Sequence, residues 1–417
     1  MTTDLRLGDV PAEELAGTYG TPLLVIDTDE LDRAIGTFEA LGAEFDLDIC
    51  YAAKALLFDA LARRIARSSL GLDICSLGEL LTAEGAGVPP ERMVMHGCGK
   101  DGAELQAAVD GRIGRVIVDH ADELQALAGL ASPARPVDVL LRVNTGIEAH
   151  THVYVRTGGE ESKFGFALAD IDAALIAATR APGLRLVGFH SHIGSQIFEG
   201  APYAASLPIL LDVYARAHAL GAPLRDLVVG GGFGVTPEPS GEGFDLRATL
   251  ELLALECTAG AAARGLPRPR LGIEPGRGII ARAGTSLYRV VSVKRQGSRL
   301  FAIVDGGIAD NPRPALYGAY HHPRLAGRAS AAAAVEFTIC GRSCENDRLV
   351  VAELPGDLRR DDLMSLDTTG AYTYSMASNY NRFGRPAVAF AGGGTHRLVV
   401  RRESPAEVLR NDVVGVD

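Results

Sequence analysis

The sequence predicts an α/β barrel of eight parallel strands, followed by a β-rich domain. Between about residues 45 and 280, eight short apolar runs alternate with stretches whose apolar residues recur at helical spacing. Each run is apolar throughout, as strands that are covered on both faces require. After about residue 282 the apolar runs are separated by turns instead of helices, which is typical of a β domain.

The predicted barrel strands end in residues that carry chemistry. Leu57, Leu61 and Ile65 recur every four residues after the first strand and predict a helix there. Glycine, histidine and other polar residues gather at the carboxyl ends of the strands, where (β/α)₈ barrels build their active sites. The predicted strands, in order, are Leu47–Lys54, Leu70–Cys75, Met93–Gly97, Arg115–Asp119, Val137–Asn144, Leu184–His192, Leu227–Gly232 and Leu271–Pro275.

The β-rich domain is predicted to take up both ends of the chain. Leu23–Asp27 reads as a strand ahead of the barrel, so we expect the first residues to join the β domain. The expected division is 28–281 for the barrel, and 1–27 with 282–417 for the β domain. Alanine-rich Ala329–Ala334 is expected to be a loop. The predicted strands of this domain are Ser286–Lys294, Leu300–Asp305, Val335–Cys340, Arg348–Glu353, Ala387–Phe390 and His396–Arg401.

Composition narrows the class of protein. The 417 residues suit two or three domains, and 47% hydrophobic with 22% charged residues is a globular balance. A net charge of −11 argues against a nucleic-acid partner, which needs a basic surface. We see no apolar run long enough for a membrane span and no secretion signal. The six cysteines lack paired spacing, so we expect reduced thiols and a cytoplasmic location.

Lys54 ends the first predicted strand, where a charged amine has no structural role. An amine at the mouth of a barrel suits one chemistry well, a Schiff base with the carbonyl of a cofactor or substrate. For a single lysine without context, a solvated strand end is the ordinary interpretation. The rest of the chain favours the chemical role, because it supplies the other parts of a site for pyridoxal 5′-phosphate (PLP).

Two more strand ends suit the phosphate and the ring of that cofactor. The glycine run 230–234, which contains Gly231 and Gly232, follows strand seven, and its backbone N–H groups can approach a phosphate closely. Glu274 ends strand eight, and a carboxylate there can pair with a protonated pyridine nitrogen, which makes the ring a better electron sink. Gly276 offers a further phosphate contact, and Arg277 can bind a carboxylate through two parallel hydrogen bonds. A tight turn and a surface Glu274–Arg277 ion pair are the structural alternatives.

His190 and His192 end strand six and leave two interpretations open. Alternate residues of a strand share a face, so this pair is also a metal-ligand pattern, and a metal-dependent barrel hydrolase is the rival from a different class. Such an enzyme needs further ligands at other strand ends, whereas strand one offers Lys54. We therefore favour His192 stacking on an aromatic ring, with Ser195 near a phosphate, and a hydrogen-bonded structural role for His190.

The β domain contributes a cysteine, an arginine and two phenols. Cys344 precedes Glu345 in a predicted turn, and a thiol in a loop beside a carboxylate can act as a proton donor. Arg313, Tyr317 and Tyr372 are weak signals by residue type alone.

Taken together and in order, these segments resemble the fold-type III, PLP-dependent decarboxylases of basic amino acids, and within them the diaminopimelate decarboxylase family. The resemblance runs from about residue 50 to 390, and the motifs are specific as a set. They are YAAKA (51–55), DICSLGEL (73–80), EAHTHVYVRTGGEESKFG (148–165), HSHIGSQ (190–196), GGGFG (230–234), EPGR (274–277), DGGIADNPRPALYGAYHH (305–322), CGRSCENDRL (340–349) and GAYTYSMASNYNRFGRP (370–386).

The resemblance implies a PLP-binding (β/α)₈ barrel with a C-terminal β-sandwich or β-barrel domain, as in alanine racemase-like proteins. It also implies a head-to-tail homodimer whose active sites are shared between subunits. Lys54 would carry PLP, His192 would stack on its ring and Glu274 would hold its nitrogen. The phosphate would be held by Ser195, Gly231, Gly232, Gly276 and Tyr372. The partner subunit would supply Cys344 as proton donor together with Glu345, and the distal end of the substrate would be bound by Arg277, Arg313, Tyr317 and Glu345.

The distal group indicates the substrate. Two arginines suit a distal carboxylate, which diaminopimelate has and ornithine and lysine lack. We therefore expect decarboxylation of meso-2,6-diaminopimelate to L-lysine and CO₂. Ala55, Asn346 and Ile308 depart from residues common in the family, which leaves open a related decarboxylase acting on another, or a carrier-bound, amino acid in a specialised pathway. A PLP racemase would need a second base facing Lys54, and the Cys344–Glu345 pair favours the decarboxylase instead.

Overall fold

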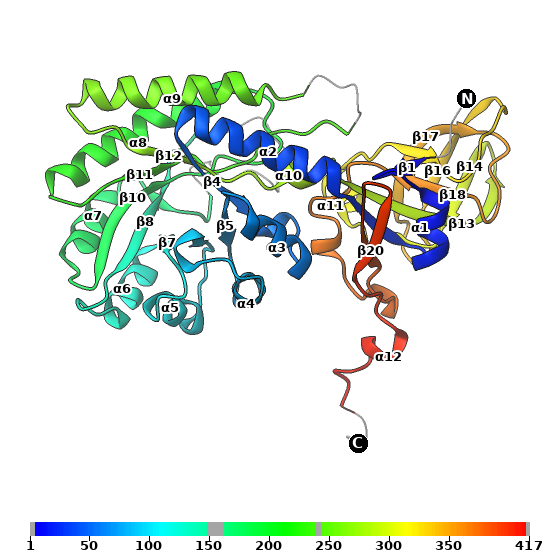
Figure 1. Ribbon diagram of the computed structural model, residues 1–417, viewed down its shortest axis with the longest axis horizontal. Helices are drawn as coiled ribbons and strands as arrows, with labels where there is room; N and C mark the ends of the chain where they lie inside the picture. The colour runs from blue at the N-terminus through cyan, green and yellow to red at the C-terminus, as the bar shows by residue number, and fades with distance from the viewer. Residues whose placement is uncertain (1–4, 148–161, 238–242, 414–417) are drawn as a thin grey trace. The chain divides into compact units, whose positions relative to one another are not determined.

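The computed structural model describes residues 5–147, 162–237 and 243–413 (Figure 1). It divides into two compact units. One comprises residues 35–235 and 243–278, and the other residues 1–34, 236–242 and 279–417. Most of the quoted segment 148–165 falls outside the described residues. Within the described part of the chain, no helix is both long and apolar enough to cross a membrane.

The first unit is a closed barrel of eight parallel strands, as predicted. Each strand pairs with the next, and the last pairs with the first through Gly272 and Asp48. The short β9 (Phe166–Ala167) pairs only with β8. The barrel strands are β4 (Leu47–Ala52), β5 (Gly71–Ile74), β6 (Met93–Met95), β7 (Arg115–Val118), β8 (Val137–Asn144), β10 (Leu184–His190), β11 (Asp226–Val228) and β12 (Arg270–Ile273).

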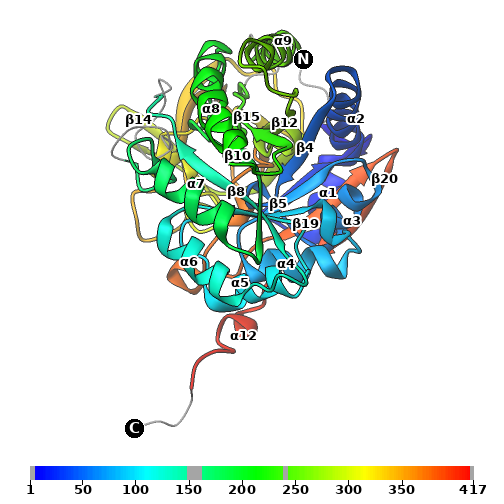
Figure 2. The ribbon, with the colours of Figure 1, turned by 90° about the vertical axis from the view of Figure 1, so that its left-hand side faces the viewer.

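Helices surround these strands, as Figure 2 shows. Apolar spacing and capping explain individual helices: α3 buries Leu61 and Ile65, and the side chain of Asp101 caps α5. The helices of this part are α2 (Thr28–Phe45), α3 (Asp59–Arg67), α4 (Leu77–Gly85), α5 (Gly102–Val109), α6 (Ala121–Leu130), α7 (Ile171–Arg180), α8 (Ala201–Ala219), α9 (Leu246–Ala263) and α10 (Arg277–Ile280), with short 3₁₀ turns η1 (Ala53–Ala55) and η2 (Pro90–Arg92).

The barrel interior is filled by side chains. One buried cluster takes a residue from each of six different strands: Cys50, Val94, Ile117, Leu140, Val187 and Val228. Arg115, the first residue of β7, forms ion pairs with Asp48 of β4 (2.6 Å) and Asp226 of β11 (3.2 Å). A solid interior leaves the carboxyl ends of the strands as the face where a ligand can bind.

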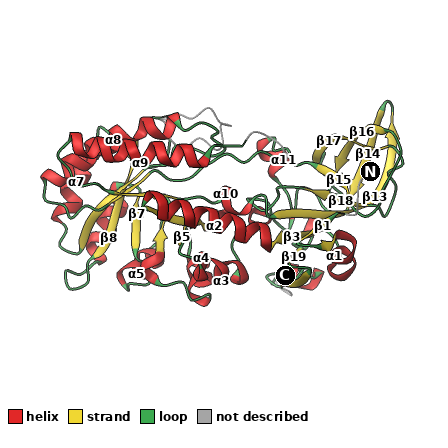
Figure 3. Ribbon diagram, turned by 45° about the horizontal axis from the view of Figure 1, so that its top comes forward, coloured by secondary structure: helices red, strands yellow, loops and turns green. Residues whose placement is uncertain are grey.

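The second unit is predominantly β-sheet, seen as yellow strands in Figure 3. Its main sheet has the order β17-β16-β14-β13-β3-β19-β20, and β13 also pairs with β18, which pairs with β15. The strands are β3 (Leu23–Asp27), β13 (Gly284–Gln296), β14 (Arg299–Val304), β15 (Pro323–Leu325), β16 (Ala334–Cys340), β17 (Arg348–Pro355), β18 (Leu363–Leu366), β19 (Ala387–Gly392) and β20 (Thr395–Val400).

The N-terminal strand β3 lies inside this sheet. It runs antiparallel to β13 and parallel to β19, and Val25 and Ile26 are fully buried. The remaining elements of the unit are short: β1 (Arg6–Leu7), β2 (Val10–Pro11), α1 (Ala12–Tyr19), α11 (Arg313–Tyr317), η4 (Tyr374–Met376), η5 (Tyr380–Arg382) and α12 (Pro405–Val408). Residues 329–333 form the expected loop ahead of β16.

Candidate active site

Lys54 lies in η1, directly beyond the end of β4. Its Nζ is 4.0 Å from Oδ2 of Asp73, and its side chain is 45% exposed, whereas the side chain of Asp73 is 2% exposed. Burial raises the pKa of Asp73 to about 6, although the nearby His96 and Lys54 oppose the rise. A reachable amine beside a buried carboxylate can exchange a proton with that carboxylate and still react with a small carbonyl compound.

Glu274, which follows β12, is a buried carboxylate with two histidine partners. His96 Nε2 lies 2.9 Å from one carboxylate oxygen and His190 Nε2 lies 3.0 Å from the other. Burial alone would raise the pKa of Glu274, but the two histidines lower it well below its ordinary value. Glu274 is therefore a fixed negative charge inside the barrel mouth, and the surface ion pair with Arg277 is not its environment.

The glycine run after β11 lets the neighbouring backbone approach it closely. Gly232 has φ +99°, and a Cβ there would lie 2.0 Å from the carbonyl oxygen of Gly194, so only glycine fits. The Gly231 N–H donates to Nδ1 of His192 at 3.3 Å. Burial lowers the pKa of His192 well below its ordinary value, which keeps this ring neutral. The run and the turn after β10, which contains Ser195, are joined by a hydrogen bond from Ile197 N–H to the Gly232 carbonyl (3.0 Å).

Gly276 lets the end of β12 approach the Lys54 turn. A Cβ at this position would lie 3.0 Å from the Cβ of Ala55 and 3.1 Å from that of Ala52. Arg277, one residue later, begins α10. The predicted cofactor residues from strands one, six, seven and eight therefore lie at the same end of the barrel.

This set of groups fits PLP. An amine suits the aldehyde, a carboxylate held as an anion suits the ring nitrogen, and glycine N–H groups suit the phosphate. The two oxygens of Glu274 each accept one histidine hydrogen bond, and a carboxylate oxygen has room for a second donor. Oδ2 of Asp73 is buried and accepts no hydrogen bond from the part of the chain that the structure describes.

In the second unit, Arg313 lies near the rings of two predicted site tyrosines. It begins α11 and is only 6% exposed. Its guanidinium carbon lies 5.1 Å from the ring centre of Tyr317 and 5.6 Å from that of Tyr372. Tyr372 adopts a left-handed backbone conformation with φ +60°, which is unusual for a bulky residue and is found at functional positions.

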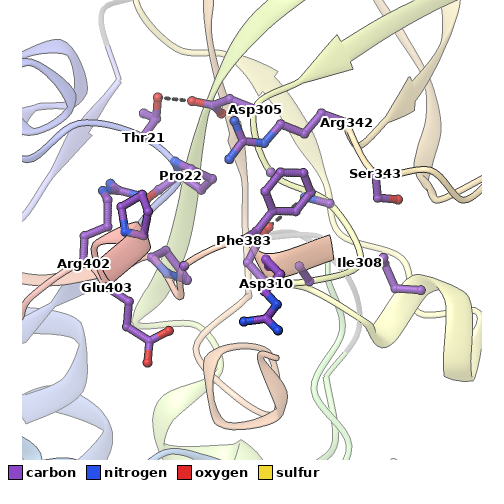
Figure 4. Close-up of a pocket in the computed structure, with 17 residues that line it drawn as sticks. Thr21, Pro22, Asp305, Ile308, Asp310, Arg342, Ser343, Phe383, Arg402 and Glu403 are labelled. Atoms are coloured by element: carbon purple, nitrogen blue, oxygen red, sulfur yellow. Dashed lines mark hydrogen bonds between the residues drawn. The ribbon is translucent and has the colours of Figure 1, made fainter. Parts of the chain in front are cut away.

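Cys344 and Glu345 lie exposed on a loop beside a cavity of about 250 Å³ in the same unit, shown in Figure 4. The Cys344 N–H donates to Oδ1 of Asn381 at 3.1 Å, and the hydroxyl of Tyr380 donates to Glu345 at 2.5 Å. Arg342, which lines the cavity, stacks over the ring of Phe383 at 4.3 Å. The loop that carries the predicted proton donor is therefore held by the segment 380–383.

Two residues of the barrel mouth, Asp73 and His96, were missing from the sequence prediction. Asp73 lies in β5 and His96 follows β6, so both lie at carboxyl ends of barrel strands. Their position is the signal that could have found them, because polar side chains at that end are the ones that face a ligand. Lys100, also overlooked, is buried and donates to Glu123 and to the Gly97 and Ile117 carbonyls, which ties the ends of β6 and β7 together.

The geometry does not favour the rival interpretation of His190 and His192 as a metal pair. His190 and His192 have separate partners, Glu274 and the Gly231 N–H. His96, His190 and Glu274 do have ligand atoms within 4.8 Å of one another. However, their N–O distances of 2.9 and 3.0 Å are those of hydrogen bonds. Two ligands on one tetrahedral zinc ion lie about 3.4 Å apart.

Comparison with known proteins shows which family the chain is similar to. The family model of the pyridoxal-dependent decarboxylases, pyridoxal-binding domain, matches residues 30–281. A diaminopimelate decarboxylase of Actinosynnema pretiosum subsp. auranticum is 43% identical over 98% of this chain and 93% of its own length. That of Bacillus subtilis is 37% identical over 98% of this chain and 95% of its own.

Solved structures give the same result. The crystal structure of diaminopimelate decarboxylase from Helicobacter pylori complexed with L-lysine has a TM-score of 0.87 and 30% identity, and the match covers 95% of this chain and 98% of that one. The structure of diaminopimelate decarboxylase from M. jannaschii in co-complex with L-lysine gives a TM-score of 0.89 at 28% identity, over 97% and 95% of the two chains. The chain therefore belongs to the fold-type III, PLP-dependent decarboxylases, in the diaminopimelate decarboxylase family.

Proposed function

We propose that this protein decarboxylates meso-2,6-diaminopimelate to L-lysine and CO₂, the last step that makes lysine from this precursor. The observation that carries the proposal is the juxtaposition of Lys54, Asp73 and the buried anion Glu274 at one end of the barrel. Relatives named for this reaction match nearly the whole chain. Membership of this family contradicts the rival interpretation as a metal-dependent hydrolase.

When bound, PLP supplies a cationic ring that accepts the electron pair left behind as CO₂ departs. The residues of this chain prepare that chemistry. Lys54 would provide the amine that holds the aldehyde of the cofactor, and Asp73, 4.0 Å away, would exchange a proton with Lys54 Nζ. Glu274 keeps a proton on the ring nitrogen because it is itself held as an anion.

Further residues are proposed to hold the cofactor in place. The neutral ring of His192 is suited to stacking on the pyridine ring. Ser195, Gly231, Gly232, Gly276 and Tyr372 are proposed to bind the phosphate.

The protonation step is proposed to need a second subunit. Cys344 would donate the proton from its thiol to the substrate's α-carbon in the active site of the partner, and Glu345 would stand beside it. The exposure of this loop in the single chain is consistent with a role in a homodimer. All six cysteines lie in described residues and none forms a disulfide, in keeping with the expected cytoplasmic location, which stays a prediction.

The substrate is proposed to be recognised at its distal carboxylate by Arg313 with Arg277, Tyr317 and Glu345. Arg313 is buried and its planar guanidinium lies near two phenol rings, a geometry that suits the binding of a carboxylate. Ornithine and lysine lack that carboxylate and could not form the charge-assisted hydrogen bond that is proposed with Arg313, which is a basis for discrimination.

The direct test is CO₂ release from diaminopimelate, lysine, ornithine and arginine, measured side by side with PLP supplied. We expect release from diaminopimelate at a rate far above the other three, and L-lysine as the product. The Lys54→Ala variant should bind no PLP covalently, so borohydride treatment should add no cofactor mass to it. Equal release from ornithine, or a borohydride adduct on Lys54→Ala, would contradict the proposal.

Arg313→Ala tests the distal carboxylate. Loss of a charge-assisted hydrogen bond costs about 1.5–3 kcal/mol, so KM for diaminopimelate should rise about 10- to 100-fold. Inhibition by an amino acid without a distal carboxylate should be unchanged. Arg359→Ala, whose side chain is 71% exposed, is the matched control and should behave like the parent protein. An unchanged KM in Arg313→Ala would remove this residue from substrate recognition.

A further inference from the structure

His96 contacts both buried carboxylates of the barrel mouth, Glu274 and Asp73. Its Nε2 lies 2.9 Å from Oε1 of Glu274 and 3.5 Å from Oδ1 of Asp73, and Asp73 in turn lies 4.0 Å from Lys54 Nζ. On the other side, His190 Nε2 lies 3.0 Å from the second oxygen of Glu274, and the two imidazole rings meet edge to face at 4.8 Å. All of these side chains except that of Lys54 are buried.

The direction of these hydrogen bonds follows from charge and burial. Burial lowers the pKa of His96 and that of His190 below their ordinary value, so both rings are neutral and carry one N–H each. An ionised carboxylate can only accept, so the N–H of each ring lies on Nε2. Nδ1 of His190 is buried and has no hydrogen-bond partner among the described residues, as an unprotonated nitrogen allows.

Other groups also interact electrostatically with Glu274, but His96 hydrogen-bonds to it directly. The charged or titratable groups that interact with its carboxylate come from five strands or the turns after them: Cys50, Asp73, His96, Arg142, and His190 with His192. Only His96 and His190 hydrogen-bond to it within the described part of the chain. Removing either donor leaves a buried carboxylate with one oxygen unsatisfied, which favours its protonated form.

We propose that His96 is a positioning residue that, together with His190, keeps Glu274 charged and fixes the direction in which its carboxylate points. The inference rests on the proposed assignment of Glu274 to the ring nitrogen of the cofactor. In this proposal His96 acts through its contact with Glu274 and not by contacting the cofactor or the substrate. Its effect is transmitted through Glu274, so it should depend on pH in a way that a merely structural role would not.

The test compares His96→Asn with His96→Gln in the purified apoprotein. Both are polar amides of similar size, but only glutamine is long enough to bring an N–H near the position of Nε2. The measured quantity is the dissociation constant for PLP between pH 6 and 8, with the visible absorbance of the bound cofactor recorded at each pH. His218→Asn, at an exposed position on α8, is the control. Circular dichroism of each apoprotein verifies that it is folded.

For His96→Asn we expect binding about tenfold weaker than in the parent protein at pH 6, converging toward the parent value at pH 8 as Glu274 regains its charge. His96→Gln should follow the parent protein at every pH. If the two variants behave alike, or if the ratio to the parent protein does not change with pH, the positioning role is overturned. Glu274→Gln tests the role of Glu274 separately from that of His96. An unchanged dissociation constant and absorbance in that variant would overturn the assignment of Glu274 itself.

Discussion

Asp73 illustrates how a single residue can serve function at the expense of stability. It is fully enclosed by β5 and its neighbours, and Oδ2 accepts no hydrogen bond from the described residues. Burial raises its pKa to about 6 from an ordinary 3.8. A buried carboxylate beside a reactive amine is useful for moving protons, but the folded chain must keep a poorly solvated charge at neutral pH.

Asp73→Asn should therefore stabilise the apoprotein at neutral pH. Because the pKa of Asp73 is raised in the native state, the penalty is present in full above pH 6, shrinks as the native carboxyl takes up a proton, and is gone near its ordinary pKa of 3.8. We expect the variant to exceed the parent protein by about 1–3 kcal/mol in free energy of unfolding at pH 8.

Urea denaturation at pH 8 and at pH 4.5 measures this difference. The gain of the Asn variant should shrink markedly at the lower pH. Asp212→Asn, at a side chain that is 67% exposed, should change stability little at either pH. If the stability gained by Asp73→Asn grows as the pH falls, the pKa of Asp73 is not raised in the folded protein.

At the scale of elements, the loop that carries Cys344 is held by η5 and its neighbours. Asn381 adopts a left-handed conformation (φ 52°, ψ 23°), which asparagine tolerates better than most residues. That conformation accompanies the contact of its Oδ1 with the Cys344 N–H. The side chain of Asn379 donates to Glu403 at 2.7 Å and to the Phe383 carbonyl at 2.9 Å, which fixes the segment from behind.

Asn381→Ala should slow turnover without much effect on substrate binding. It removes the acceptor for the Cys344 N–H and places alanine in an unfavourable backbone conformation. Loss of about 1–1.5 kcal/mol in positioning corresponds to a roughly tenfold fall in kcat. Asn381→Asp keeps an acceptor oxygen and tolerates the same conformation, so it should retain most activity. Steady-state kinetics on diaminopimelate distinguishes the two, and equal rates would mean that this hydrogen bond does not position Cys344.

Strands that are buried on both faces could be predicted from the sequence, whereas two short strands of the β domain could not. All eight barrel strands and seven β-domain strands, β3 among them, were found, because continuous apolar runs between turns or helices mark buried strands. β15 (Pro323–Leu325) and β18 (Leu363–Leu366) were missed. The first is three residues long and begins with proline, and the second follows the charged run Arg359–Asp362, so neither offers a clear period.

At the scale of the whole molecule, the sequence indicates which residues at the strand ends carry chemistry. It does not indicate which of these side chains contact one another. Lys54 and Glu274 were recognised because an amine and a carboxylate at strand ends have few structural uses. The hydrogen bond between His96 and Glu274 joins residues 178 positions apart, and no local pattern encodes it. Only closure of the barrel, through β12 and β4, brings the ends of distant strands into one mouth. The roles proposed for Cys344 and Lys54 extend this logic from one chain to two.

If each active site combines Lys54 of one subunit with Cys344 of another, two inactive variants should restore activity to each other. Lys54→Ala and Cys344→Ala homodimers each lack one essential group in both sites. In a mixed dimer one site lacks both groups, while the other has both. Random reassortment of equal amounts makes half of the dimers mixed, so activity should recover to about a quarter of the parent value. The measurement is CO₂ release from diaminopimelate after the two variants are dissociated and reassembled together, against the same treatment of each alone. If both groups of a site came from one chain, mixing would restore nothing, because every chain in the mixture would still carry a defect in its own site.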